Sequence, residues 1–582
     1  MLGLAQPTAP SGIIALKLAS LYSARQKKTA QRLTLHLYHQ AKVAFKKVDN
    51  ERYVVHLSQV TEAFRNARDP KTSEEGVLQF CIVETYFKRA ERLKQWGQFS
   101  LAQASYKKAK KWGNTEAQAQ LTVPSRFWHC RGFVSSALTF KKTKNPPVID
   151  PVKNFLIDNW QTSETFRQAY AYVQHRAAED GFFISYEGNR SKPYPVMPDV
   201  CCLHKAAEIP LQQRINTIFS ALQKIVFTYH HDARLQAFLA IPQALNYWVM
   251  QDSEPSHRSI DLCRFDMMGG NLDTLRIIEF NANAPGGIVY FGLINTYWRE
   301  APGIAKIISN WGSVPSIFER PGWFSDWITN LAYRRELRSI NAIGLLHPLH
   351  GNINELPHLQ KRLQHQGYQC TMMPLSDAYQ NGKPLWQVAY LKYGVQRALK
   401  DISQLERFCA SVINNEIVVP SSLSGRWIGD NKLCLAVMSD PRFAYLFNSV
   451  EQQAIRQMIP YSRKLDDGIS VENLLAQKDN WVIKNPYDTR GAGVFIGRDH
   501  TEVQWRRLVA GQQLAGFLVQ EYIDSGASIA GNIAPPSFRD LIAVIASGRI
   551  VGYASRVSSS YKVNLAQEGK HLSVLSALNV NA

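Results

Sequence analysis

The 582-residue sequence lacks several features, and each absence excludes a class of protein. No apolar run is long enough to span a bilayer, so we expect no transmembrane segment. No Lys or Arg precedes the apolar patch at residues 13–16, which makes this start a poor match to a secretory signal. The simplest expected location is therefore cytoplasmic.

Cysteine is present but unpatterned. The eight cysteines are irregularly spaced, and none belongs to a CxxC pair. This spacing argues against a disulfide framework or a zinc site. We expect reduced thiols that lie mostly in the core. The adjacent Cys201 and Cys202 should point in different directions, which makes them a poor chelating pair.

Acidic residues are scarce relative to basic ones, giving a formal net charge of +20. More than half of this excess lies in residues 1–115. Such a surface attracts phosphates, nucleic acid or acidic lipid headgroups, or is simply the solvated face of helices. No recognised nucleic-acid motif accompanies the charge, so a nucleic-acid partner is not expected.

Proline and glycine are nearly absent from residues 33–121, where the pattern is helical. Two stretches in it, 37–70 and 86–114, carry small residues at intervals that resemble tetratricopeptide-type helical hairpins. The second is the better match, because WGQFSLAQASYKKAKKWG resembles the turn and second helix of such a repeat. An ordinary helical bundle fits the same pattern. Either arrangement offers residues 33–120 as a surface for a protein partner.

The rest of the chain predicts a mixed α and β fold. Prolines break the pattern between 115 and 150, where we expect a domain boundary. Strand-like segments at 342–346 and 368–373 flank a helical run, which favours a strand–helix–strand unit. The predicted organisation is a helical domain at 1–120, a connecting region at 121–190 and an α+β or α/β domain at 191–582.

The segment CRFDMMGGNLDTLRIIEFNAN, residues 263–283, reads as two strands joined by a Gly-Gly-Asn turn. Alternation places Arg264 and Asp266 on one face of the first strand, and Glu279 and Asn281 on one face of the second. If the two faces coincide, two carboxylates and an amide oxygen suit Mg²⁺ and the guanidinium suits a phosphate or carboxylate. A hairpin crossed by a salt bridge is the alternative.

Three later segments carry weaker signals. In WVIKNPYDTRGAGVFIG, a strand ends at Lys484 and a glycine turn follows, which suits phosphate oxygens without matching the Walker pattern. In FLVQEYID, a strand ends at Gln520 and Glu521, where backbone can bind an adenine edge. In residues 538–569, two strands are joined by a turn at Ser547–Gly548. Arg556 lies on the second strand, where it could contact a phosphoryl group, and Lys562 and Asn564 follow it. Ordinary hairpins and strand ends remain alternatives for each.

Together these segments, over residues of roughly 190–575, resemble the circularly permuted ATP-grasp family, especially its glutathionylspermidine-synthetase-like members. That family's order is R-x-D, E-x-N, N-K on a helix, a strand Lys with a glycine loop, and Q-E. The matching residues are Arg264 and Asp266, Glu279 and Asn281, Asn431 and Lys432, Lys484 with Gly491 and Gly493, and Gln520 with Glu521. The metal residues precede the lysine loop, as in the permuted members.

The resemblance implies a role for each position in an ATP- and Mg²⁺-dependent carboxylate–amine ligase. The Mg²⁺ ligands would be Asp266, Glu279 and Asn281. The nucleotide contacts would come from Lys432 and Lys484, the loop of Arg490, Gly491 and Gly493, and the adenine-pocket residues Gln520, Glu521 and Tyr522. The acyl-phosphate intermediate would be steadied by Arg264 and Arg556.

One departure bears on the substrate. Glutathionylspermidine synthetases have a Ser three residues after the metal Asn, where this chain has Ala284, and no amidase-like Cys–His domain is recognisable. The resemblance therefore implies a small-molecule or peptide carboxylate and an amine acceptor without identifying either. The alternative from another class is a nucleotide-binding scaffold whose helical N-terminal region recruits a protein partner.

Overall fold

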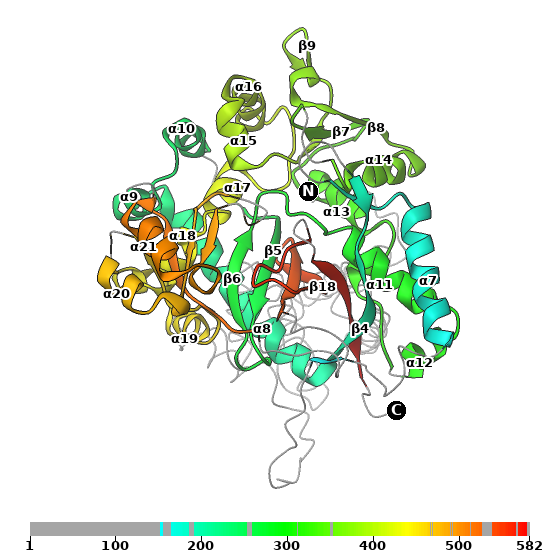
Figure 1. Ribbon diagram of the computed structural model, residues 1–582. Helices are drawn as coiled ribbons and strands as arrows, with labels where there is room; N and C mark the ends of the chain where they lie inside the picture. Colours follow the sequence, from blue (N-terminus) through cyan, green and yellow to red (C-terminus); the bar gives the residue numbers. More distant parts are fainter. Residues whose placement is uncertain are drawn as a thin grey trace, which may run out of the picture. The chain divides into compact units, whose positions relative to one another are not determined.

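The computed structural model describes residues 152–154, 164–185, 191–252, 259–310, 312–349, 353–465, 467, 469–488, 491, 493–511, 514–525, 538–565 and 569–578. These residues belong to one compact unit, Thr143–Ala582, whose first residue lies within the window where the sequence places a domain boundary. The predicted tetratricopeptide-like region lies outside the described residues. The described part mixes helices with several sheets, which confirms the predicted α+β class (Figure 1).

An eight-stranded sheet forms the centre of this unit, in the order β1-β4-β19-β18-β17-β5-β6 with β16 also paired to β18. All its neighbours are antiparallel except β19 and β4. Its strands are β1 (Val152–Asn154), β4 (Val196–His204), β5 (Leu262–Met268), β6 (Arg276–Asn281), β16 (Phe538–Arg539), β17 (Leu541–Ala546), β18 (Arg549–Ser558) and β19 (Lys570–Ala577).

Helices cover both faces of this sheet. One core packs α8 (Lys205–Tyr229) against residues such as Cys201 and Phe265, and the other packs α11 (Tyr290–Glu300) and α7 (Glu164–Glu179) against residues such as Cys202. The adjacent cysteines thus face opposite cores, as the alternation of a strand requires. All six cysteines within the described ranges are buried free thiols, which confirms the expectation for them.

A parallel three-stranded sheet, β11-β7-β8, forms a second layer. Its strands are β7 (Ala342–His347), β8 (Gln369–Pro374) and β11 (Val388–Leu391), and α14 (Leu356–His365) connects β7 to β8. This confirms the predicted strand–helix–strand unit. α13 (Trp323–Arg334) packs against α14, whereas α12 (Ala305–Asn310) and η4 (Ile317–Glu319) pack against α11. The other elements in this part of the sequence are η5 (Leu375–Asp377), β9 (Tyr379–Gln380), β10 (Lys383–Pro384), α15 (Val395–Lys400) and α16 (Ile402–Ile413).

A four-stranded sheet, β12-β15-β13-β14, carries the glycine turn. Its strands are β12 (Ser462–Lys464), β13 (Trp481–Lys484), β14 (Val494–Ile496) and β15 (Leu518–Glu521), all paired antiparallel. Trp505 on α21 (Glu502–Ala510) packs in its core with Leu474 of α20 (Val471–Ala476). The short η7 (Lys478–Asn480) and η8 (Gly497–Asp499) flank its strands.

Of the remaining described helices, two lie between β4 and β5 in the sequence and four lie between β11 and β12. They are α9 (Ala233–Leu239), α10 (Gln243–Gln251), α17 (Leu423–Gly429), α18 (Leu433–Ser439), η6 (Pro441–Leu446) and α19 (Ser449–Met458), and the hairpin β2 (Phe183–Ser185) and β3 (Ser191–Pro193) completes the set of elements. No helix in the described ranges combines the length and apolar character needed to cross a membrane.

Two turns follow from the sequence as predicted. Ser547 and Gly548 link β17 to β18 with positive φ angles of 48° and 74°, the geometry of a two-residue hairpin turn. Between β5 and β6, Asn271 accepts hydrogen bonds through Oδ1 from the amides of Asp273 and Thr274. These turns set the register of β5, β6, β17 and β18, which carry the residues described next.

Candidate active site

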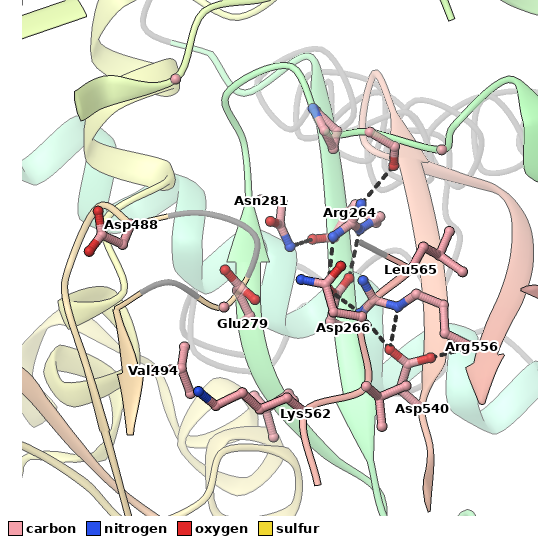
Figure 2. Close-up of a pocket in the computed structure, with 18 of the residues that line it drawn as sticks. Arg264, Asp266, Glu279, Asn281, Asp488, Val494, Asp540, Arg556, Lys562 and Leu565 are labelled. Carbon is pink, nitrogen blue, oxygen red and sulfur yellow. Dashed lines mark hydrogen bonds and ion pairs between the residues drawn. The ribbon is translucent and has the colours of Figure 1, made fainter. Parts of the chain in front are cut away.

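The pairing of β5 with β6 brings the predicted residues together. Arg264 lies directly opposite Asn281, and Asp266 lies directly opposite Glu279. Directly paired residues of an antiparallel sheet share a face, so the four side chains lie on the same side of the hairpin. The register that the sequence could not determine is therefore the one that gathers them (Figure 2).

Two arginines and two aspartates beside this hairpin are joined by ion pairs in the order Arg264, Asp266, Arg556 and Asp540. Arg264 donates to both carboxylate oxygens of Asp266, over 2.7 and 2.9 Å, and to the Gly286 carbonyl over 2.6 Å. Arg556 of β18 donates through Nη2 to Asp266 over 2.8 Å and through Nε to Asp540 over 2.8 Å. Figure 2 shows how the two guanidinium groups lie on either side of Asp266. Both aspartates are buried, so the arginines compensate their charges.

Burial and the arginines act oppositely on these aspartates. Burial opposes ionisation of Asp266, but Arg264 and Arg556 outweigh it and hold its pKa below the usual value. At Asp540 the effect of burial is larger than that of Arg556, so the pKa of Asp540 is raised. The neighbouring charge of Asp266 raises it further. The arginines therefore favour the ionised form of Asp266 more strongly than that of Asp540.

Lys484 lies at the end of β13, buried beside β6. Its Nζ donates to the Ile278 carbonyl over 2.8 Å and to Gln520 Oε1 over 2.7 Å. Since an ammonium has three donors, one hydrogen remains for a group in the cavity. Burial lowers the pKa of Lys484 to about 8, and Glu279 partly opposes that shift.

Lys432 joins the two halves of the site. Its Nζ lies 3.1 Å from Glu279 Oε1 and donates to the Asp488 carbonyl over 2.7 Å, while its backbone amide donates to the Pro486 carbonyl. The preceding Asn431 donates to Tyr487 Oη over 3.1 Å. The Asn–Lys pair thus connects β6 to the start of the glycine turn.

The strand β15 closes the opposite end. The Gln520 side chain is buried between Lys484 and Ser462. Its Oε1 accepts a hydrogen bond from Lys484 Nζ, and its Nε2 donates one to Ser462 Oγ. Glu521 is exposed at the strand end, and Arg498 lies over the Tyr522 ring with 4.1 Å to its centroid. The aromatic and apolar surroundings of this strand end suit a flat ring.

A cavity of about 600 Å³ connects these groups. It runs from the glycine turn and β15, past Asp266 and Glu279, to the carboxyl ends of β7 and β11. There Glu355 accepts hydrogen bonds from the amides of Gly287 and Val289 and from Lys392 Nζ, which fixes the loop after Asn281. A cavity of this size accommodates a nucleotide or a substrate of similar size.

The donor set fits Mg²⁺ in chemistry. Asp266, Glu279 and Asn281 offer hard oxygens, which Mg²⁺ prefers, and phosphates or waters normally complete its octahedron. Within the described residues no group of three or more His, Cys, Asp or Glu side chains is placed to hold a metal ion by itself. Two carboxylates and an amide are consistent with an ion whose remaining ligands come from a nucleotide.

The structure places most of the predicted residues on one cavity wall. The residues that line it are Arg264, Asp266, Glu279, Asn281, Lys484, Gly491, Gln520, Glu521, Tyr522 and Arg556. Lys432 and Gly493 are not among the described lining residues, and Lys432 is instead bonded to Glu279 and the Asp488 carbonyl. Arg490 lies outside the described residues. The role of each residue stays a prediction.

Sequence reasoning missed six charged residues that line this cavity: Glu355, Lys392, Arg397, Asp430, Asp488 and Asp540. Asp540 precedes the fully buried strand LIAVIA, and Asp430 directly precedes the Asn–Lys pair. A charged residue next to such segments is a usable signal. Glu355 and Lys392 carry no comparable sequence signal, because only the tertiary fold brings them to the loop after Asn281.

No protein-family model and no curated protein matches the sequence. Among solved structures, the fold is similar to that of a glutathione synthetase-like effector from Globodera pallida in its apo form. The identity is 12%, the alignment covers 71% of this chain and 97% of that chain, and the TM-score is 0.43. A likeness at this level does not identify a function.

Proposed function

We propose that the protein is an ATP- and Mg²⁺-dependent carboxylate–amine ligase of the ATP-grasp type. The observation that carries the proposal is one cavity lined both by the paired Asp266 and Glu279 with two arginines and by Lys484, the glycine turn and the end of β15. Positioning and charge neutralisation are what phosphoryl transfer asks of a protein. The wall supplies these groups without an evident nucleophile.

In the proposed ligase, each group of lining residues would bind a different part of the substrates. Asp266, Glu279 and Asn281 would hold Mg²⁺, which neutralises phosphate charge when bound. Lys484 would direct its open N–H at a phosphate oxygen, and the end of β15 would receive the adenine. Arg264 and Arg556 would face the carboxylate that becomes an acyl phosphate.

The proposal predicts ATP turnover that depends on a carboxylate. The full-length protein is incubated with MgATP, hydroxylamine as acceptor, and a panel of amino acids and dipeptides as carboxylates. We expect ADP release and hydroxamate formation with at least one of them, because hydroxylamine traps an acyl phosphate. ADP release without hydroxamate from any panel member contradicts the proposal, and so does the absence of both products.

Nucleotide binding should take up protons at pH 8. The pKa of Lys484 is about 8 in the free protein, so about half of these side chains are then unprotonated. A phosphate beside the ammonium raises that pKa, and binding takes up as much as about half a proton. Calorimetry in buffers of different ionisation enthalpy measures the uptake. Lys484→Met should abolish it and the exposed Lys400→Met should retain it; equal uptake in both variants contradicts the role.

A further inference from the structure

Asp430 lies between α17 and the Asn–Lys pair in the sequence, and in the fold it lies beside the end of β6. Its Oδ1 accepts hydrogen bonds from the amide of Ala282 over 2.9 Å and from the amide of Asn283 over 3.1 Å. Both amides belong to the segment that directly follows Asn281. One oxygen of Asp430 therefore anchors the backbone at the end of β6, which fixes the direction of the side chain.

The other oxygen of Asp430 is open to the cavity. Asp430 lines the cavity, and its Oδ2 accepts no hydrogen bond from any residue that the structure describes. The buried carboxylates of the wall already have partners: Asp266 and Asp540 are bonded to arginines, and Glu355 to backbone amides and Lys392. Among the described lining residues there is no His and no Cys. Asp430 is half-buried, and it is one of three half-buried lining carboxylates, with Glu279 and Asp488, that keep an oxygen with no hydrogen bond from a described residue. Glu279 is already assigned to the metal in the proposed function, and Asp488 is tested by a separate variant.

The surroundings of Asp430 favour proton uptake. Burial raises its pKa, Lys432 opposes this shift, and the like charge of Glu279 adds to it. The titratable and charged groups that face it are Lys432, Glu279, Arg426, Tyr487 and the thiols of Cys263 and Cys434. Arg426 is bonded to Asn283 and to backbone carbonyls, so it holds the neighbouring loop in place.

We propose that Asp430 is the general base that deprotonates the amine acceptor, with Oδ2 as the accepting atom. This rests on the proposed ligase function, because an amine is protonated at neutral pH and cannot attack until it loses a proton. The anchoring of Oδ1 holds Oδ2 toward the cavity beside Glu279 and Asn281, where the activated carboxylate would lie.

Oδ2 takes one proton from the ammonium, and the freed nitrogen lone pair forms a C–N bond to the acyl carbon. The C–O bond to phosphate breaks, and inorganic phosphate leaves with the electron pair and a second proton from the nitrogen. Asp430 then releases its own proton to solvent, so each turnover yields one amide, one phosphate and one free proton.

Two kinds of acceptor separate this role from a structural one. Hydroxylamine is largely unprotonated at pH 7 and needs no base, whereas methylamine, putrescine and glycine are almost wholly protonated. Asp430→Asn keeps an Oδ1 acceptor for the Ala282 and Asn283 amides and removes the basic oxygen. With MgATP and the carboxylate found above, we expect the ratio of amide to hydroxamate to fall about 100-fold. The acid limb of the pH–rate profile for amide formation should also move to higher pH, toward the pKa of the amine itself, because only amine that is already unprotonated can then react.

Matched variants make the outcome decisive. The exposed Asp377→Asn should leave the ratio unchanged, and Asp488→Asn tests the other carboxylate near this wall. The proposal is overturned if Asp430→Asn keeps the wild-type ratio, if it lowers both products equally, or if Asp488→Asn alone lowers the ratio. Wild-type protein that forms hydroxamate but no amide from any protonated amine also overturns it. Wild-type protein that forms neither product refutes the ligase function itself.

Discussion

Replacing Glu279 with glutamine should lower ATP turnover by about 10²- to 10³-fold, the loss typical of removing one preorganised electrostatic contact. Glu279 lies opposite Asp266 and 3.1 Å from Lys432 Nζ, with its side chain 26% exposed toward the cavity. Glutamine keeps the size and can still accept from Lys432, so the fold should persist. What disappears is the negative charge that a divalent cation needs.

The measurement is ADP release in the hydroxylamine assay, together with MgATP affinity by calorimetry. Glu300→Gln serves as the matched control, because Glu300 is exposed at the end of α11 and does not line the cavity. Its turnover should equal that of wild type. Turnover and MgATP affinity that both remain within about threefold of wild type in Glu279→Gln would remove the metal assignment, since a ligand's charge should alter at least one of them.

Replacing Asp540 with alanine should destabilise the central sheet by about 3–5 kcal/mol, the usual result of leaving a buried charge without its partner. Asp540 is 3% exposed and accepts hydrogen bonds from both the backbone amide and the guanidinium of Arg556. Without it, Arg556 keeps only Asp266, which Arg264 already holds. Native-state hydrogen exchange of β17 and β18 measures the change, because a chain with more than one unit need not unfold in one transition.

Two further variants identify the cause of that loss. Asp540→Asn preserves an oxygen acceptor and should cost clearly less than alanine. The double change Asp540→Leu with Arg556→Met removes both charges and should recover part of the stability, because two apolar groups leave no unpaired ion. A double variant that is less stable than Asp540→Ala would show that packing, rather than the unpaired charge, dominates at this position.

Alternation and turn residues were sufficient to predict the strands of the site. The segment WVIK forms β13 with the predicted bounds, and the Ser547–Gly548 turn has the predicted hairpin geometry. Helical periodicity is less informative: residues 209–250 have a helical pattern throughout but form parts of three helices, because Asp232 caps a new helix and Ala240 takes a left-handed conformation. The order of the strands in the sheets was not predictable, since it depends on contacts between distant segments.

The composition of the site was only partly readable. Arg264, Asp266, Glu279 and Asn281 were identifiable because a local hairpin gathers them, and hairpin register is short-range information. Asp540 and Asp430 act through partners far away in the sequence, Arg556 and the end of β6. Their roles depend on burial, which determines whether a carboxylate is ion-paired, anchored or open. Burial of an isolated charged residue cannot be read from its local pattern.

The position of β17 has a consequence for synthesis. This strand lies between β5 and β18, so β5 gains its second neighbour only after nearly all of the described chain has left the ribosome. Until then β5 presents an unpaired edge, and the nascent hairpin is exposed to pairing with other chains. Such long-range pairing slows folding. A truncation before Leu541 would therefore leave an incomplete sheet prone to association, in addition to removing Arg556.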